Sequence, residues 1–367
     1  MLFRARMAGL AWASERGRAV GMVAATAGFL SVWALAAAAP AVAEGAASIV
    51  ATDASPSLSP VDSVAVAHGA VVYTAVDGAR RVGARAGSAP LIPFTGSLRR
   101  IAADPNPDSE ELPTWSLAAS RRWVATMVDT GPGPPKGGTA ARLDGSGRAA
   151  VPMACGGTVS VVGDRVVYVQ CRDRTPIGKV VAYDLRRKNT TRITRQLVLD
   201  PVAAGGWVAY TSYDDDAEPL VLAPLREATR PSRVVANSDR YDVQADGKLA
   251  FAVGTPACQQ GEGVLEWTAP HTRATTLAPC VSTIGVAIAA DRVLAVDTTQ
   301  TPNHVTRWAL DGSSEVLATV DPGSIRALDD DGTAAAVVQH ACGQERVVLL
   351  TGGTGPADLT SAACPGP

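Results

Sequence analysis

A unit of roughly 40 residues repeats along this chain, and it is clearest between Thr158 and Thr194. Short β-branched runs in this stretch are separated by the turn Gly163-Asp164, by a polar loop and by the turn from Arg186 to Asn189. The pattern predicts four strands, with too little sequence between them for a crossover helix. We therefore expect each unit to fold as one four-stranded antiparallel sheet.

Seven copies of this unit can be aligned on their second strands. The aligned positions are 41 to 44 residues apart, except for a first interval of 52 residues. They are Tyr73, Ala125, Tyr168, Tyr210, Phe251, Ala295 and Ala336. Four strands in a repeat of this length are typical of propeller blades. The sequence therefore predicts an all-β fold, a seven-bladed β-propeller of four-stranded antiparallel blades in residues 60–364.

The N-terminal segment has the pattern of an export signal. Four arginines precede an apolar stretch from Val20 to Ala39, which ends at the small residues Ala41-Val42-Ala43. This arrangement predicts a signal peptide in residues 1–43, and residues 44–59 follow as a linker. The alternative is an uncleaved anchor, because the apolar stretch is long enough to cross a bilayer. After cleavage we expect a secreted, periplasmic or cell-envelope protein without a membrane span.

The charge balance limits the classes of partner. The formal net charge is −2, so the chain lacks the basic footprint of a nucleic-acid-binding protein. We expect no nucleic-acid partner. A protein or a cell-wall polymer fits an exported propeller better, and we expect the chain to act as a monomer.

One repeat resembles a known family. The stretch from Leu112 to Ala125 is similar to the Pro-x-Trp-Ser-Pro-Asp-Gly repeat of TolB-like (WD40-like) propellers, and Val181 to Leu185 is similar to their Tyr-Val-x-Asp-Leu strand. Most other copies lack the central Trp-Ser-Pro-Asp-Gly residues. The resemblance implies a periplasmic or extracellular interaction scaffold, and it supplies no catalytic motif.

The six cysteines fall at one face of the expected propeller. An even number of cysteines in an exported chain favours disulfides, and the chain has no Cys-x-x-Cys spacing of a metal site. Cys155 and Cys171 lie almost symmetrically about the turn Gly163-Asp164. The other four occupy equivalent places in the fifth and seventh units. We expect the pairs Cys155 with Cys171, Cys258 with Cys280, and Cys342 with Cys364.

The same face carries the longer connections between second and third strands. They include Asp129 to Thr139, Arg172 to Gly178, Tyr213 to Pro219, Pro256 to Gly263 and Thr298 to His304. Binding residues concentrate on loops held by a rigid scaffold, so this long-loop face is the expected binding surface. The alternative is that these loops are solvated connections without a role in binding.

Polar groups are sparse on the innermost strands, which line the channel of a propeller. The candidates are Ser116, Asp200, Asp242, Gln244 and Asp329. They are too few for a general acid and base, so we expect a non-catalytic binding scaffold without a metal or cofactor. The alternative is a propeller hydrolase or lyase with a divalent metal in the channel, held by Asp200, Asp242 and Asp329.

A second acidic group lies in a loop. Asp214, Asp215, Asp216 and Glu218 offer carboxylates to a cation such as Ca²⁺, but they lack the alternate spacing and central glycine of an EF-hand loop. A solvated acidic loop is the simpler interpretation.

Closure of the ring has two possible solutions. The seventh unit has a candidate fourth strand of its own in residues 357–361, which favours a self-contained last blade. The alternative is that the β-like stretch from Ala47 to Thr52 pairs with the outer edge of that blade and covers it. The sequence favours the self-contained blade, because four strands can be counted without the N-terminal stretch.

Overall fold

The structure is a computed structural model of all 367 residues, and it describes most of the expected propeller. The described residues are 47–52, 64–67, 70–74, 80–83, 92–94, 114–129, 137–143, 147–152, 154–170, 177–213, 218–226, 232–236, 238, 240–351 and 355–364. All of them belong to one compact unit, residues 42–367. The predicted signal peptide lies outside them. Within the described part, no helix is long and apolar enough to cross a membrane.

The described strands follow one another as antiparallel groups of four. The first three groups are β2 (Val64–Ala67), β3 (Ala70–Thr74), β4 (Arg80–Gly83), β5 (Ile92–Phe94); β6 (Thr114–Ala119), β7 (Trp123–Asp129), β8 (Gly138–Arg142), β9 (Arg148–Val151); and β10 (Ala154–Val162), β11 (Arg165–Gln170), β12 (Lys179–Asp184), β13 (Asn189–Arg192). The next two are β14 (Val198–Ala204), β15 (Trp207–Ser212), β16 (Pro219–Pro224), β17 (Ser232–Ala236); and β18 (Arg240–Val243), β19 (Leu249–Gly254), β20 (Glu262–Thr268), β21 (Thr275–Ser282).

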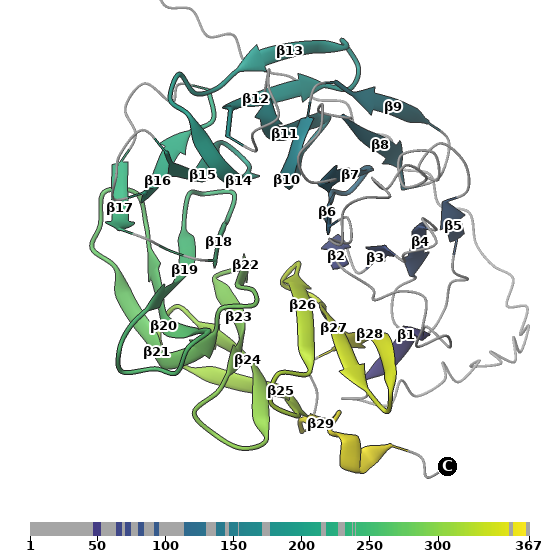
Figure 1. Cartoon of the computed structure of the whole chain (residues 1–367), viewed down its shortest axis with the longest axis vertical. Coiled ribbons are helices and arrows are strands. Elements are labelled where there is room, and N and C mark those ends of the chain that lie inside the picture. Colours follow the sequence, from purple (N-terminus) through teal and green to yellow (C-terminus); the bar gives the residue numbers. More distant parts are fainter. Residues whose placement is uncertain are drawn as a thin grey trace, which may run out of the picture. The chain divides into compact units, whose positions relative to one another are not determined.

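The last groups are β22 (Ala287–Ala289), β23 (Arg292–Asp297), β24 (Asn303–Ala309), β25 (Ser314–Val320); and β26 (Ile325–Asp330), β27 (Ala335–Ala341), β28 (Gln344–Leu350), β1 (Ser48–Thr52). A single pair, Val281 opposite Asp297, joins β21 to β23 and merges two groups into one sheet. Each sequence repeat thus corresponds to one group, which we call a blade and number from one to seven. Figure 1 shows the blades of this unit around a central space, with the first strand of each innermost.

The core is divided among the junctions between neighbouring blades. Strands two and three alternate along their length, so that successive side chains face the blade before and the blade after. Tyr168 faces the second blade, for example, while its neighbour Val167 faces the fourth, and both side chains are fully buried. The last junction packs Val66, Val71 and Tyr73 of the first blade against Val338 of the seventh. The first and last blades therefore adhere by the same apolar packing as the others.

The N-terminal strand closes the seventh blade, so the prediction of a self-contained last blade was wrong. Strand β1 pairs antiparallel with β28 at its outer edge, and Ser48 lies opposite Leu349. This strand lies within residues 44–59, which the sequence favoured as a linker. The predicted fourth strand in residues 357–361 is only the two-residue β29 (Ala357–Asp358), which pairs parallel with β25 of the sixth blade. A pairing between strands some 300 residues apart leaves no local signature in the sequence.

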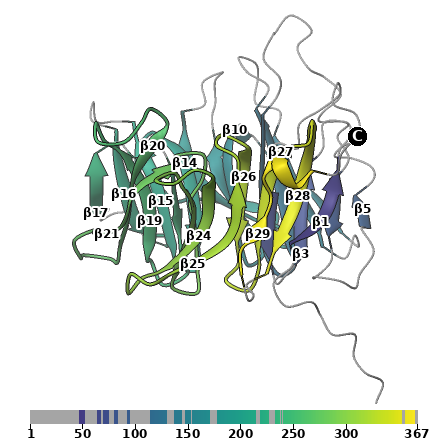
Figure 2. The same cartoon turned by 90° about the horizontal axis from the view of Figure 1, so that it is seen from below.

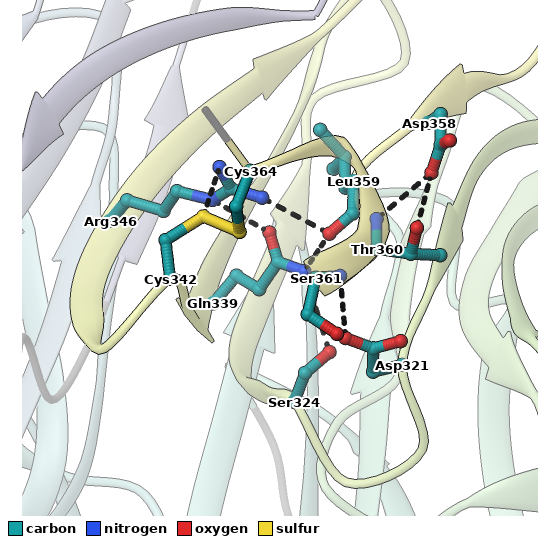
Figure 3. The surroundings of a disulfide bond; sticks show 10 residues. All are labelled: Asp321, Ser324, Gln339, Cys342, Arg346, Asp358, Leu359, Thr360, Ser361 and Cys364. Atoms are coloured by element: carbon teal, nitrogen blue, oxygen red, sulfur yellow. Dashed lines mark hydrogen bonds between the residues drawn. A yellow bond between two sulfur atoms is a disulfide. The ribbon is translucent and has the colours of Figure 1, made fainter. Parts of the chain in front are cut away.

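The C-terminal segment fastens the seventh blade to the sixth. Leu359 is buried in the core between these blades, and its carbonyl oxygen accepts hydrogen bonds from Gln339 Nε2 at 2.7 Å and Arg346 Nη2 at 3.0 Å. The backbone N–H of Ser361 donates to Asp321 Oδ2 at 2.7 Å. Figure 3 shows these contacts beside the disulfide between Cys342 and Cys364. Residues 355–364 are therefore called the C-terminal clasp.

Two of the three predicted cysteine pairs are bonded in the structure. They are Cys258 with Cys280 in the fifth blade, and Cys342 with Cys364, which anchors the clasp. Cys171 lies outside the described residues, so its pairing with Cys155 stays a prediction.

Replacing both Cys342 and Cys364 by serine is expected to lower the free energy of unfolding by about 3 kcal/mol. The bond closes a loop with a sequence separation of 22, and the bond between Cys258 and Cys280 has the same separation. The two double variants therefore lose the same loop-entropy contribution. A larger loss of unfolding free energy in the Cys342 and Cys364 variant would measure the additional contribution of the clasp. Denaturant unfolding of both variants, with peptide mapping under non-reducing conditions, checks the pairing and the effect. A pair that joined other cysteines would contradict the blade register.

Gly247 is expected to be intolerant of a side chain. It lies in the turn of the fifth blade with φ of +90°, and an added Cβ would lie 2.6 Å from the indole ring of Trp207 in the fourth blade. We expect Gly247→Ala to cost about 2 kcal/mol in denaturant unfolding. Gly163→Ala is the matched control, because φ is also positive there but nothing lies within 4 Å of the added atom. Equal losses would show that the ring contact does not matter.

Candidate functional site

The innermost strands surround a cavity of about 830 Å³. Its walls are mostly small and branched apolar side chains, such as Val64 and Val161, from the first strands of the blades. It also reaches the turns between first and second strands, through Arg121, Gly163 and Gly205. We call the end of the blades that carries these turns the turn face; it is opposite the long-loop face, and Figure 2 shows the strands running between the two ends.

Two of the predicted channel residues line this cavity. Asp242 lies on β18 and Asp329 on β26. Each carboxylate accepts a hydrogen bond from the innermost strand of the next blade: Ile288 N–H donates to Asp242 Oδ2 at 2.8 Å, and Val66 N–H donates to Asp329 Oδ2 at 2.6 Å. Both side chains therefore couple neighbouring blades, and Asp329 does so across the junction of the last blade with the first.

Ser160 makes the same kind of bridge, and the sequence interpretation missed it. Its Oγ accepts the N–H of Ala203 in the fourth blade at 2.9 Å. The three N–H donors, Val66, Ala203 and Ile288, occupy equivalent positions in their blades. Each lies opposite the second-strand residue that comes two places before the aligned position of its repeat. A lone polar residue in the apolar run from Val159 to Val162 was the signal that could have revealed it.

The electrostatic environment of the cavity disfavours charge on its carboxylates. Burial raises the pKa of Asp242 to about 6, although the N–H groups of Ile288 and Val243 oppose this change. Burial also raises the pKa of Asp329 well above its ordinary value, and the nearby charge of Asp242 adds to this effect. Burial therefore costs more free energy when these carboxylates are ionised than when they are protonated.

The contribution of Asp242 to stability is expected to fall as the pH rises from about 4 to above 6. Its pKa is about 6 in the fold against an ordinary value of 3.8, so folding favours the protonated form. That stabilisation is fully present at a pH below the ordinary pKa of 3.8, and it is lost as the pH rises through the folded pKa of about 6. A carboxyl ¹³C NMR titration checks it, with Asp358 as an internal control whose pKa is lowered by hydrogen bonds from Thr360. An Asp242 signal that titrated at its ordinary pH would contradict the prediction.

The remaining predicted channel residues do not line the cavity in the structure. Ser116 lies half-buried on β6, outside the cavity wall. Asp200 occupies an irregular part of β14 with φ of +47°, and its carbonyl oxygen accepts a hydrogen bond from the Tyr241 hydroxyl. Gln244 lies in the turn after β18 and bonds Asp246 and Asp291. Asp200 and Gln244 thus link neighbouring blades.

The three carboxylates of the metal alternative do not gather. Among the described residues, no group of three histidine, cysteine or acidic side chains is placed to hold a metal ion. The carboxylates of Asp242 and Asp329 each bond the next blade, whereas the contact described for Asp200 is made by its carbonyl oxygen. Of the acidic loop considered for Ca²⁺, Asp214 to Asp216 lie outside the described residues and Glu218 is exposed.

A buried ion pair joins the sixth and seventh blades, and sequence reasoning did not find it. Arg307 on β24 donates from Nε to Asp330 Oδ2 at 2.7 Å and from Nη2 to Asp330 Oδ1 at 2.9 Å. Both side chains are at most 3% exposed. Asp330 Oδ1 also accepts the N–H of Gly332, so the same carboxylate holds the following turn as well as the contact between blades.

Comparison with known proteins supports the fold. No protein-family model matches the chain, and no curated protein matches its sequence. The structure of YCF48 bound to D1 peptide is similar with a TM-score of 0.50 and 10% identity, covering 84% of this chain and 96% of that one. TolB from Acinetobacter baumannii gives a TM-score of 0.45 and 12% identity, covering 76% of this chain and 60% of the TolB chain.

Both solved proteins are β-propellers, and the likeness to YCF48 concerns the fold alone. This chain spans about three fifths of the TolB chain. The all-β fold of four-stranded antiparallel blades that the repeats predicted is confirmed by the strand topology and by the likeness to YCF48. The chain is a β-propeller.

Proposed function

We propose that this chain is an exported, non-catalytic β-propeller that binds a protein partner at its central cavity. The observation that carries the proposal is a cavity of about 830 Å³ with mostly apolar walls, whose carboxylates are engaged in holding the blades together. Concave apolar pockets with few polar groups are typical binding sites. Asp242 and Asp329 have their hydrogen bonds within the fold, which suits a scaffold better than acid–base chemistry.

Export and partner class rest on separate arguments. The predicted signal peptide in residues 1–43 and the disulfides suit an oxidising compartment such as the periplasm or the cell exterior. YCF48, a propeller of similar fold, was solved with a D1 peptide, which shows that such a scaffold can hold a peptide in that protein. The sequence predicted a protein or a cell-wall polymer as the partner and the long-loop face as the binding surface. That polymer and that face remain the alternatives to the present proposal.

The test fills the cavity. Ala119 and Ala204 line it near the turn face and are half-buried, so Ala119→Trp with Ala204→Trp is expected to block it. Thr275→Trp, at an exposed position on the outer strand β21 of the fifth blade, is the control. Cross-linking in culture, followed by quantitative mass spectrometry, is expected to recover a partner with the natural chain and the control but not with the blocked variant. Equal recovery by all three chains, or no enriched protein, would overturn the proposal.

A further inference from the structure

Three arginines of the second blade surround a hollow at the turn face. Arg121 and Arg122 lie exposed in the turn between β6 and β7, and Arg142 ends β8. Together with Leu143 they line a pocket of about 450 Å³, which we call the arginine pocket. The turn that carries the first two is fastened to the third strand, because Leu143 N–H donates to the carbonyl oxygen of Arg122 at 2.9 Å.

One arginine of the pocket, Arg142, lies against a fixed aromatic ring. The Trp123 side chain is 7% exposed, and its ring lies beneath the Arg142 guanidinium, 5.6 Å from the ring centroid. The indole Nε1–H donates to Asp164 Oδ1 of the third blade at 3.0 Å, which fixes the ring. Stacking of a cation on an indole face is favourable and places Arg142 before any ligand arrives. A positioned guanidinium loses less freedom on binding than a mobile one.

The positive charge of the arginine pocket is not compensated by its described surroundings. No ion pair joins Arg121, Arg122 or Arg142 to a described carboxylate. On the neighbouring third blade, the Asp164 carboxylate is already bonded to Trp123 and to Arg186, whose Nε lies 2.8 Å from Asp164 Oδ2. Three guanidiniums around one hollow therefore favour an anionic group, which arginine holds through paired hydrogen bonds.

The arginine pocket adjoins the central cavity. Arg121 lines both, and beside it the cavity wall is formed by Ala118 and Ala119. A ligand that occupies both places needs an anionic group next to an apolar part. A peptide segment supplies both, whereas a sugar polymer or a polyphosphate lacks the apolar part.

The rest of the turn face does not suit an extended anionic surface. On the fifth to seventh blades the turns present the carboxylates of Asp246, Asp291, Asp311 and Asp331, with Lys248 paired to the first two. A membrane or a long polyanion laid across the whole face would meet these carboxylates. The turn of the third blade adds the exposed Arg186, Arg187 and Lys188, so this basic region extends over the second and third blades. A region of this size suits a short segment better than a surface laid across the whole face.

We infer that the arginine pocket binds the carboxylates of an acidic peptide segment of a protein partner, with neighbouring apolar residues of that segment in the central cavity. The inference rests on the proposed function and adds the chemistry of the partner. Arg142 supplies the positioned fork, and Arg121 and Arg122 close on the anion from the adjacent turn.

The experiment uses a short fluorescein-labelled peptide with a block of glutamates followed by a block of valines, and its glutamine counterpart. Fluorescence polarisation with the mature chain is expected to show binding of the acidic peptide only. The variant Arg121→Gln, Arg122→Gln, Arg142→Gln is expected to weaken binding at least about tenfold. The matched control, Arg226→Gln, Arg273→Gln, Arg326→Gln, removes the same charge from exposed positions elsewhere and is expected to stay within about twofold. Thermal unfolding verifies that both variants are folded.

Several outcomes would overturn the inference. Equal weakening in the two variants would show diffuse attraction, and equal binding of the glutamine peptide would show that charge is not read. Absence of binding to the acidic peptide would also overturn the inference. So would the finding that the chain co-sediments with phosphatidylglycerol vesicles through the pocket arginines but does not bind the peptide. If the cavity-blocking variant loses the captured partner while the arginine variant keeps it, this inference fails and the proposed function stands.

Discussion

A chain that begins at residue 53 is expected to unfold with a free energy about 4 kcal/mol smaller than a chain that begins at residue 47. The two chains differ only in Ala47 and strand β1, which pairs with β28 at the outer edge of the seventh blade. Without β1, the edge of β28 is open, and Val347, Val348 and Leu349, each at most 1% exposed, lose one neighbour. Burying an aliphatic side chain contributes about 1.5–3 kcal/mol, so partial exposure of three adds up to this loss.

Chemical denaturation of both chains measures the difference directly. A synthetic peptide of residues 47–53, added in excess to the shorter chain, is expected to restore part of the stability, because it can pair with the open edge. Coincident unfolding curves for the two chains would show that β1 does not close the ring. The packing of the first blade on the seventh would then be sufficient by itself.

The blades were predictable because their information is local. Alternating apolar residues and short turns specify each four-stranded sheet, and the aligned positions Tyr168, Tyr210 and Phe251 are fully buried, as second strands facing two neighbours should be. The closing strand was not predictable in the same way. Its partner lies at the far end of the chain, and a count of four local strands made the short β29 a plausible but wrong substitute.

The cavity was predictable only in part. Asp242 and Asp329 stand out as charged residues in apolar innermost strands, and both line the cavity. Ser116, Asp200 and Gln244 followed from the same reasoning, but a strand irregularity and a turn direct the last two elsewhere. The arginine pocket depends on three side chains that meet through the fold of one blade, and the sequence shows them only as common surface residues.

Replacing Arg307 by methionine is expected to lower the free energy of unfolding by about 3–5 kcal/mol. Its guanidinium holds both carboxylate oxygens of Asp330 at the junction of the sixth and seventh blades, where the aspartate side chain is 0% exposed. Without the arginine, a buried carboxylate loses its counter-charge. The exposed pair of Arg292 with Glu315, 3.6 Å apart, provides the control, and Arg292→Met is expected to cost less than about 1 kcal/mol.

The pH dependence of the Arg307→Met variant separates loss of charge pairing from loss of packing. Burial already raises the pKa of Asp330, and Arg307 is the main group that opposes this change. Removing Arg307 raises the folded pKa of Asp330 further, so the variant is expected to regain stability relative to the natural chain as the pH falls and the carboxyl is protonated. Adding Asp330→Asn to the variant is expected to recover part of the loss at neutral pH, since no buried charge is left and the amide oxygen can still accept the Gly332 N–H. A loss that stayed constant with pH and was not relieved by Asp330→Asn would assign the effect to packing and would contradict a role for the ion pair.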